Sequence, residues 1–186
     1  EHGYFRVIAQ GCIDRTLIPA ATNECGAFGD FFAKLVETYG RGPFLELIST
    51  DAGITSAADA RLVNAASVGY LMAIKGDQPT IFDEAKHLLG NGAKKQAGYV
   101  CEAKTPWERY KGKRIRRELY RCRFEDWPNW ESARQLWRVK QTTEQHDGRR
   151  EGEDRYFVTN LPWGRLKPLD ILAVVRAHWA IEDGLH

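Results

Sequence analysis

Two carboxylates in this chain of 186 residues occupy positions where acidic groups commonly do chemistry. Asp51 follows the apolar run Pro43–Thr50 and precedes Gly53, so it lies where a predicted strand ends and the chain turns. In open α/β sheets, functional side chains gather outside the carboxyl ends of strands, because neighbouring loops converge there. The alternative is an aspartate that only serves the turn or caps a helix, although Ser56 provides a better cap.

Glu182 lies on the apolar stripe of a predicted C-terminal helix. Its stripe recurs at helical spacing and therefore forms one helix face: Ile171, Val175, His178, Glu182 and Leu185. A carboxylate that faces the protein without a partner costs several kcal/mol, so Glu182 needs one. The candidates are a metal ion, an arginine and His178 one turn earlier. From the residues alone, the pair with His178 is the simpler interpretation.

Two carboxylates on separate elements are also typical of two-metal phosphoryl transfer. Such sites place acidic oxygens around hard cations about 3.5–4 Å apart, and they normally use a third carboxylate. Asp14 lies in a predicted hairpin turn, and turn chemistry explains Asp77, so neither fills this gap. Lys75 follows another predicted strand, where it is either a solvated lysine or a point charge for a phosphate. The glycine loops of nucleotide-binding proteins and the usual hydrolase motifs are absent from the sequence.

The elements that must position these residues follow from apolar spacing. Alternation of strand and helix in the first half predicts an α/β sheet with parallel members. Asn23 or Thr22 is expected to cap the first helix, and Ser56 the second. Strands are predicted at Tyr4–Ile13, Thr16–Ala21, Pro43–Thr50 and Tyr70–Ile74, and helices at Ala27–Tyr39, Ala57–Ser67 and Pro79–Leu89.

The pattern changes after the glycine- and lysine-rich segment Gly90–Lys95. We expect a β-rich insertion over residues 97–160, between a first α/β part (1–96) and a C-terminal helical part (161–186). The polar segment Gln141–Arg155 is predicted to be an exposed loop, and Leu169–Leu185 to be a helix with Pro168 in its first turn. The insertion strands are predicted at Tyr99–Ala103, Lys113–Phe124, Arg134–Lys140 and Tyr156–Asn160.

A net charge of +2 conceals a basic segment. Between Lys104 and Arg123 there are nine Lys or Arg and two Glu, which leaves the rest of the chain net acidic. Such a segment predicts a polyanionic partner, most commonly nucleic acid, and a solvated charged surface is the alternative. Trp107, Tyr110 and Tyr120 lie among the bases and offer surfaces on which nucleobases stack.

Other classes of protein are disfavoured by composition. No apolar run is long enough to span a bilayer, and no signal segment opens the chain. Four cysteines without a paired spacing indicate reduced thiols in a cytoplasmic protein rather than a disulfide scaffold. Since the chain begins at Glu1 and stops at His186 inside a predicted helix, we expect it to be a piece of a longer protein.

Three segments in this order carry a resemblance to a known family: Ser49–Ala52, Tyr70–Pro79 and Arg176–His186. They resemble the DDE transposases of bacterial insertion sequences, in the branch of the H-repeat-associated proteins. The corresponding family patterns are a strand ending in Asp-Ala, a strand with Leu-Lys-Gly-Asn-Gln, and a helix with Arg-x-His-Trp-x-Ile-Glu-Asn-x-Leu-His-Trp. Asn23-Glu24, Trp127-Pro128 and Tyr156–Leu161 also fit, so the resemblance covers nearly the whole chain.

The resemblance implies a ribonuclease-H-like fold, a mixed sheet flanked by helices with a β-rich insertion before the last helix. Asp51 matches the second catalytic Asp and Glu182 the catalytic Glu, and both would ligate two Mg²⁺ or Mn²⁺ ions. The family's first catalytic Asp lies in an Asp-Gly-Lys segment that is absent here, and we expect it upstream of Glu1. Asp77 and Asp183 depart from the family pattern, which has Asn at both positions.

The resemblance also gives the basic segment a partner, which is DNA. Trp107 or Trp130 would stack on an unpaired base, with core packing as the alternative role. The implied activity is metal-dependent DNA strand cleavage and transfer at insertion-sequence ends, with these residues inactive alone, by a homo-oligomer assembled on DNA in the cytoplasm and nucleoid. The alternatives are a non-catalytic DNA-binding relic of a decayed element and a nuclease of the same fold acting on RNA. The predicted DNA contacts are Lys75, Lys111, Lys113, Arg114, Arg116, Arg117 and Arg176.

Overall fold

The computed structural model describes residues 23–40, 45–91, 100–125 and 127–184, with the side chains of residues 24 and 180–184 left out of the description. The strands predicted at Tyr4–Ile13 and Thr16–Ala21 lie outside these ranges, and so does Asp14. Within the described ranges, no helix has the length and apolar character needed to cross a membrane.

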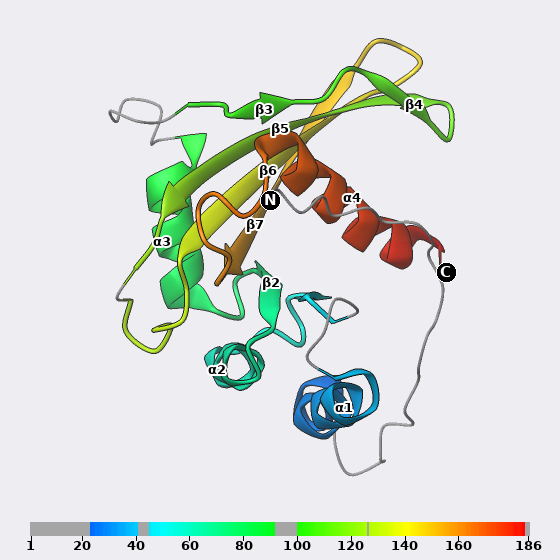
Figure 1. Ribbon diagram of the computed structural model, residues 1–186. Coiled ribbons are helices and arrows are strands. Elements are labelled where there is room, and N and C mark those ends of the chain that lie inside the picture. The colour runs from blue at the N-terminus through cyan, green and yellow to red at the C-terminus, as the bar shows by residue number, and fades with distance from the viewer. Residues whose placement is uncertain (1–22, 41–44, 92–99, 126, 185–186) are drawn as a thin grey trace.

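A mixed β-sheet forms the centre of the described structure (Figure 1). Its order is β1-β2-β7-β6-β5-β3, and β4 pairs with β5 beside β3. β1 and β2 are parallel, and every other pair of neighbouring strands in this sheet is antiparallel. The strands are β1 (Leu47–Thr50), β2 (Gly69–Ile74), β3 (Ala103–Lys104), β4 (Glu108–Tyr110), β5 (Lys113–Arg123), β6 (Gln135–Glu144) and β7 (Arg150–Thr159).

Four helices accompany the sheet: α1 (Glu24–Tyr39), α2 (Ala57–Ala65), α3 (Pro79–Leu89) and α4 (Pro168–Gly184). Both predicted caps are confirmed. The Asn23 side chain accepts a hydrogen bond from the Gly26 N–H, and Ser56 accepts one from the Asp59 N–H. The predicted α/β class, a mixed sheet flanked by helices with some parallel pairing, is therefore confirmed.

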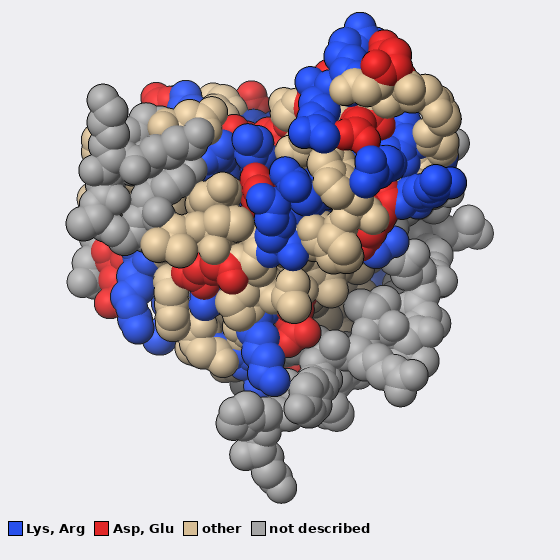
Figure 2. Space-filling view, turned by 90° about the horizontal axis from the view of Figure 1, so that it is seen from above, with Lys and Arg blue, Asp and Glu red and all other residues tan. Residues whose placement is uncertain are grey.

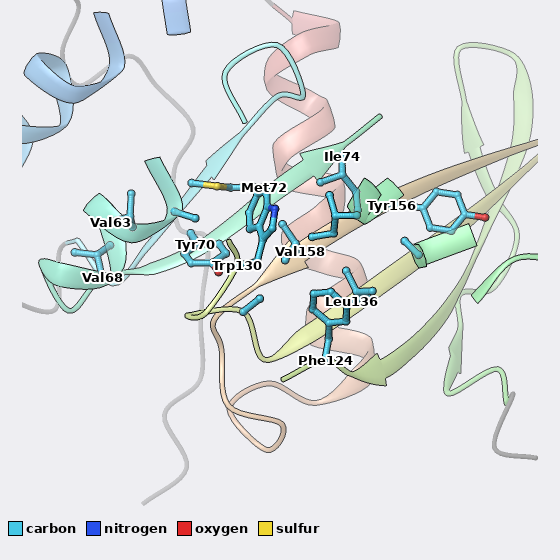
Figure 3. Close-up of a cluster of buried hydrophobic side chains, with 14 of the residues drawn as sticks. Val63, Val68, Tyr70, Met72, Ile74, Phe124, Trp130, Leu136, Tyr156 and Val158 are labelled. Atoms are coloured by element: carbon cyan, nitrogen blue, oxygen red, sulfur yellow. The ribbon is translucent and has the colours of Figure 1, made fainter. Parts of the chain in front are cut away.

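Side chains that alternate along the strands divide the core into two layers. Tyr70, Met72 and Ile74 of β2 point toward the cluster that contains residues of α1, α2 and α3 (Figure 3). Leu71 and Ala73 of β2 belong to the other cluster, which contains Ile171, Val175 and Trp179 of α4 among its residues. Because each buried apolar side chain of this size contributes about 1.5–3 kcal/mol, the two clusters hold α4 and the other helices on opposite faces.

The prediction of an exposed loop over Gln141–Arg155 is wrong. β6 and β7 continue as paired strands until Glu144 faces Arg150, and only residues 145–149 form the turn. The segment lacks an apolar face, so its period-two pattern is invisible in the sequence. Cross-strand charges stabilise it instead, because Glu144 binds Arg150 within the hairpin and Arg114 of β5 on the other side.

Strand β4 was also not predicted. It returns into β5 through a two-residue turn in which Lys111 and Gly112 both have positive φ, 45° and 79°. This conformation suits a tight hairpin, and glycine at the second position adopts it without steric cost. The β-rich insertion strands thus join the same sheet as β1 and β2.

Candidate functional site

Asp51 follows β1 directly and begins a tight turn. Its backbone carbonyl accepts hydrogen bonds from the Ile54 N–H at 3.1 Å and the Thr55 hydroxyl at 3.0 Å. Its carboxylate accepts the Ala52 N–H at 2.7 Å, while about half of the side chain remains exposed. The turn therefore fixes the base of a carboxylate whose other oxygen is not used by Ala52.

Lys75 follows β2, the parallel neighbour of β1. Its Nζ lies 3.6 Å from Asp51 Oδ1, and both side chains are more than half exposed. Parallel pairing accounts for the contact, because the carboxyl ends of neighbouring parallel strands lie at the same edge of a sheet. An exposed pair of this kind contributes at most about 1 kcal/mol to stability, so its importance lies in the cation it keeps beside Asp51.

His178 connects α4 to the same strand. Its Nδ1 lies 3.1 Å from the Ser49 hydroxyl, and its ring meets Phe157 of β7 edge to face. The imidazole is 9% exposed, so α4 holds it against the sheet. Glu182 lies in the same helix one turn later, but its side chain is outside the described residues, and its pairing with His178 or with a metal stays a prediction.

Among the side chains that the structure describes, no three His, Cys, Asp or Glu residues form a group suited to a metal ion. Asp51 is the predicted ligand that the description includes. Its carboxylate is a hard oxygen donor at an exposed strand end, a donor type that Mg²⁺ and Mn²⁺ prefer.

A second candidate surface lies on the β4–β7 end of the sheet. The guanidinium carbons of Arg116, Arg114 and Arg150 lie 4.7, 5.2 and 5.5 Å from the centre of the Trp107 ring. We call these four residues the basic surface. Glu144 binds Arg114 and Arg150 at 2.7 Å, so three guanidiniums share this one close carboxylate. The hydrogen bond from Arg150, together with Arg114, holds the pKa of Glu144 below its usual range.

Lys and Arg side chains gather on the side of the molecule seen in Figure 2, with Asp and Glu among them. Lys111 and Lys113 are exposed at the β4–β5 turn, as a contact with a polyanion would require. Arg150 was missed by the sequence analysis, because its segment was interpreted as a loop, and only the strand pairing brings it to Trp107.

Two of the predicted DNA contacts lie elsewhere. Arg117 is 8% exposed, its guanidinium stacks on Trp179 of α4, and it binds Glu108 at 3.4 Å. Arg176 is exposed but also binds Glu108, at 3.1 Å. Both arginines thus contribute to the contact between α4 and the sheet, on the face opposite to Trp107. Trp130 is 7% exposed within the core, which fits its packing alternative.

The sequence matches no model of a known protein family, and it matches no curated protein.

Proposed function

We propose that this chain forms part of the catalytic core of a DDE-type DNA transposase with a ribonuclease-H-like fold. Asp51 and Glu182 would be two of its metal ligands, and the basic surface would hold DNA. The proposal includes assembly as a homo-oligomer on DNA in the bacterial cytoplasm. The observation that carries it is the course of α4 along β1.

Two contacts give that course its direction. Just before both elements, Arg165 binds Glu46 at 3.2 Å, and near the end of β1 His178 contacts Ser49 at 3.1 Å. The helix therefore runs along β1 in the direction of the strand, across the sheet face opposite to α2 and α3 (Figure 1).

Spacing then supports a meeting of the two acidic positions. Asp51 lies two residues beyond Ser49, which is about 6.6 Å along a strand. Glu182 lies four residues beyond His178, which is about 6 Å along a helix and one turn further on the same face. Equal advances from one shared contact favour neighbouring positions for Asp51 and Glu182.

The described residues suit binding of a phosphodiester between these positions. Two divalent ions, when bound, would polarise the phosphate and activate the attacking water or 3′-hydroxyl. Asp51 would hold an ion through its carboxylate, and Lys75 would neutralise a phosphate oxygen after leaving Asp51. His178 would orient the helix that carries Glu182 through its bond to Ser49. Phosphates further along the DNA would contact Arg114, Arg116, Arg150 and the β4–β5 turn.

The test uses the complete open reading frame that contains this sequence and a plasmid that carries the gene with its flanking DNA. Cleavage of the plasmid is measured in Mg²⁺ or Mn²⁺ for the unaltered protein and for Asp51→Asn, Glu182→Gln and Asp77→Asn. Asp77 is an exposed aspartate after the neighbouring strand, so Asp77→Asn controls for the loss of a charge at this edge. We expect the first two variants to lose cleavage by at least about a hundredfold and Asp77→Asn to retain it.

Metal-dependent cleavage that persists in Asp51→Asn would refute the proposal. DNA binding without any divalent-dependent cleavage by the unaltered protein would favour the alternative, a non-catalytic DNA-binding relic, which the excess of arginine around Trp107 supports by itself.

A further inference from the structure

Gln78 joins the ends of the two parallel strands. Its side-chain Nε2 donates hydrogen bonds to two backbone carbonyls of the turn after β1, those of Ala52 at 3.2 Å and Thr55 at 3.0 Å. Its Oε1 accepts the N–H of Lys75, directly after β2, at 3.2 Å. Both N–H bonds and the carbonyl of one amide are thus committed to backbone groups of the two loops.

The same turn carries Asp51. Thr55, whose carbonyl Gln78 binds, donates its hydroxyl to the Asp51 carbonyl and its N–H to the Ala52 carbonyl. The Ala52 N–H in turn binds the Asp51 carboxylate. A short chain of hydrogen bonds therefore links the Gln78 amide to the carboxylate of Asp51, and a direct bond links it to the backbone of Lys75.

We propose that Gln78 is a positioning residue, which sets the place of the Asp51 carboxylate and its distance from Lys75. This inference rests on the proposed function in one respect, namely that the carboxylate so placed binds a metal ion. Residues that orient a metal ligand without touching the metal commonly change metal affinity 10- to 100-fold when they are replaced.

Gln78 is well suited to a clean substitution. It is the N-cap residue of α3, yet its side chain makes no capping hydrogen bond to that helix. Gln78→Met keeps the length and unbranched shape of the side chain and removes all three amide contacts, so α3 retains its N-terminus. Gln145→Met is the matched control, since Gln145 is also half-buried and binds one side chain, Glu151, in the distant β6–β7 hairpin.

Two measurements test the inference. Hydrogen–deuterium exchange of a peptide covering residues 51–56 reports on the turn itself, and needs no activity. Cleavage measured against Mn²⁺ concentration, with the complete reading frame, separates the half-saturating concentration from the maximal rate. For Gln78→Met we expect faster exchange of residues 51–56 and a half-saturating Mn²⁺ concentration raised about tenfold, with neither change in Gln145→Met.

Unchanged exchange in Gln78→Met would overturn the inference, whatever happens to cleavage. Faster exchange with an unchanged Mn²⁺ dependence would overturn the metal-positioning role, provided that Asp51→Asn abolishes cleavage. If Asp51→Asn cleaves normally, the proposed function itself is wrong, and the exchange measurement then decides whether Gln78 fixes the turn.

Discussion

Arg116 and Arg117 are adjacent in β5 and point to opposite faces of the sheet, so they form a natural pair of matched substitutions. Arg116 lies over Trp107 on the basic surface and makes a long ion pair, 4.0 Å, with Glu118. Arg117 lies under α4 between Glu108 and Trp179. We expect Arg116→Gln to weaken DNA binding and Arg117→Gln to weaken folding.

The expected magnitudes follow from these surroundings. Loss of one phosphate contact makes the slope of log affinity against log salt shallower by about 0.9, which is roughly an eightfold loss of affinity at about 0.1 M salt. Arg117→Gln removes a half-buried charge-assisted contact and a cation–π contact, so the free energy of unfolding should fall by about 1–2 kcal/mol. The salt slope should stay unchanged in that variant, because the Arg117 guanidinium is enclosed by the sheet and α4.

The assay is fluorescence anisotropy with a labelled duplex of mixed sequence, titrated at several salt concentrations, combined with urea unfolding of each variant. A shallower salt slope in Arg117→Gln at unchanged stability would contradict the reasoning. So would an unchanged slope in Arg116→Gln. Failure of the unaltered protein to bind DNA at low salt would remove nucleic acid as the partner of this surface.

Further outcomes follow from three buried groups. Arg138 is 1% exposed and binds Asp154 at 2.8 Å, so Arg138→Met should lower the free energy of unfolding by about 3 kcal/mol, as measured in urea. Burial raises the pKa of the Cys122 thiol to about 11, so iodoacetamide at neutral pH should label the exposed Cys101 and spare Cys122 until the protein is unfolded. For Glu118, desolvation would raise the pKa, but Lys104 and other nearby cations outweigh it and lower the pKa from its ordinary 4.5. The unfolded chain therefore takes up this proton first as pH falls, so stability should decline below pH 4.5 and decline less in Glu118→Gln.

The helices could be predicted closely because their signals are local. α3 has the predicted bounds Pro79–Leu89, with proline in the first turn, and the caps at Asn23 and Ser56 are single-residue features. Strands β6 and β7 are longer than predicted because their distal halves are polar on both faces. Their pairing depends on β5, a strand more than ten residues away in sequence, and on charges that match only after the register is set.

The error concerning Arg117 had a usable signal in the sequence. Ile115 and Leu119 flank Arg117 at a spacing of two, so alternation already places its side chain on an apolar face of a strand. Arg114 and Arg116 fall on the other face by the same rule. Net charge over a segment cannot make this distinction, since it counts both faces of a strand together.

The candidate site shows where prediction from residue patterns must stop. The end of a strand is visible in the sequence, so Asp51 could be found, and parallel pairing then brings Lys75 beside it. Gln78 binds backbone carbonyls, which every residue possesses, so no pattern of residue types identifies its partners. Likewise, helical periodicity gives the face that Glu182 shares with His178, whereas only the contact with Ser49 gives that face a position along β1. Because two separate contacts, at Glu46 and Ser49, determine the course of α4, replacing either one should tilt the helix without unfolding it. The acidic positions would then separate while the sheet stays intact.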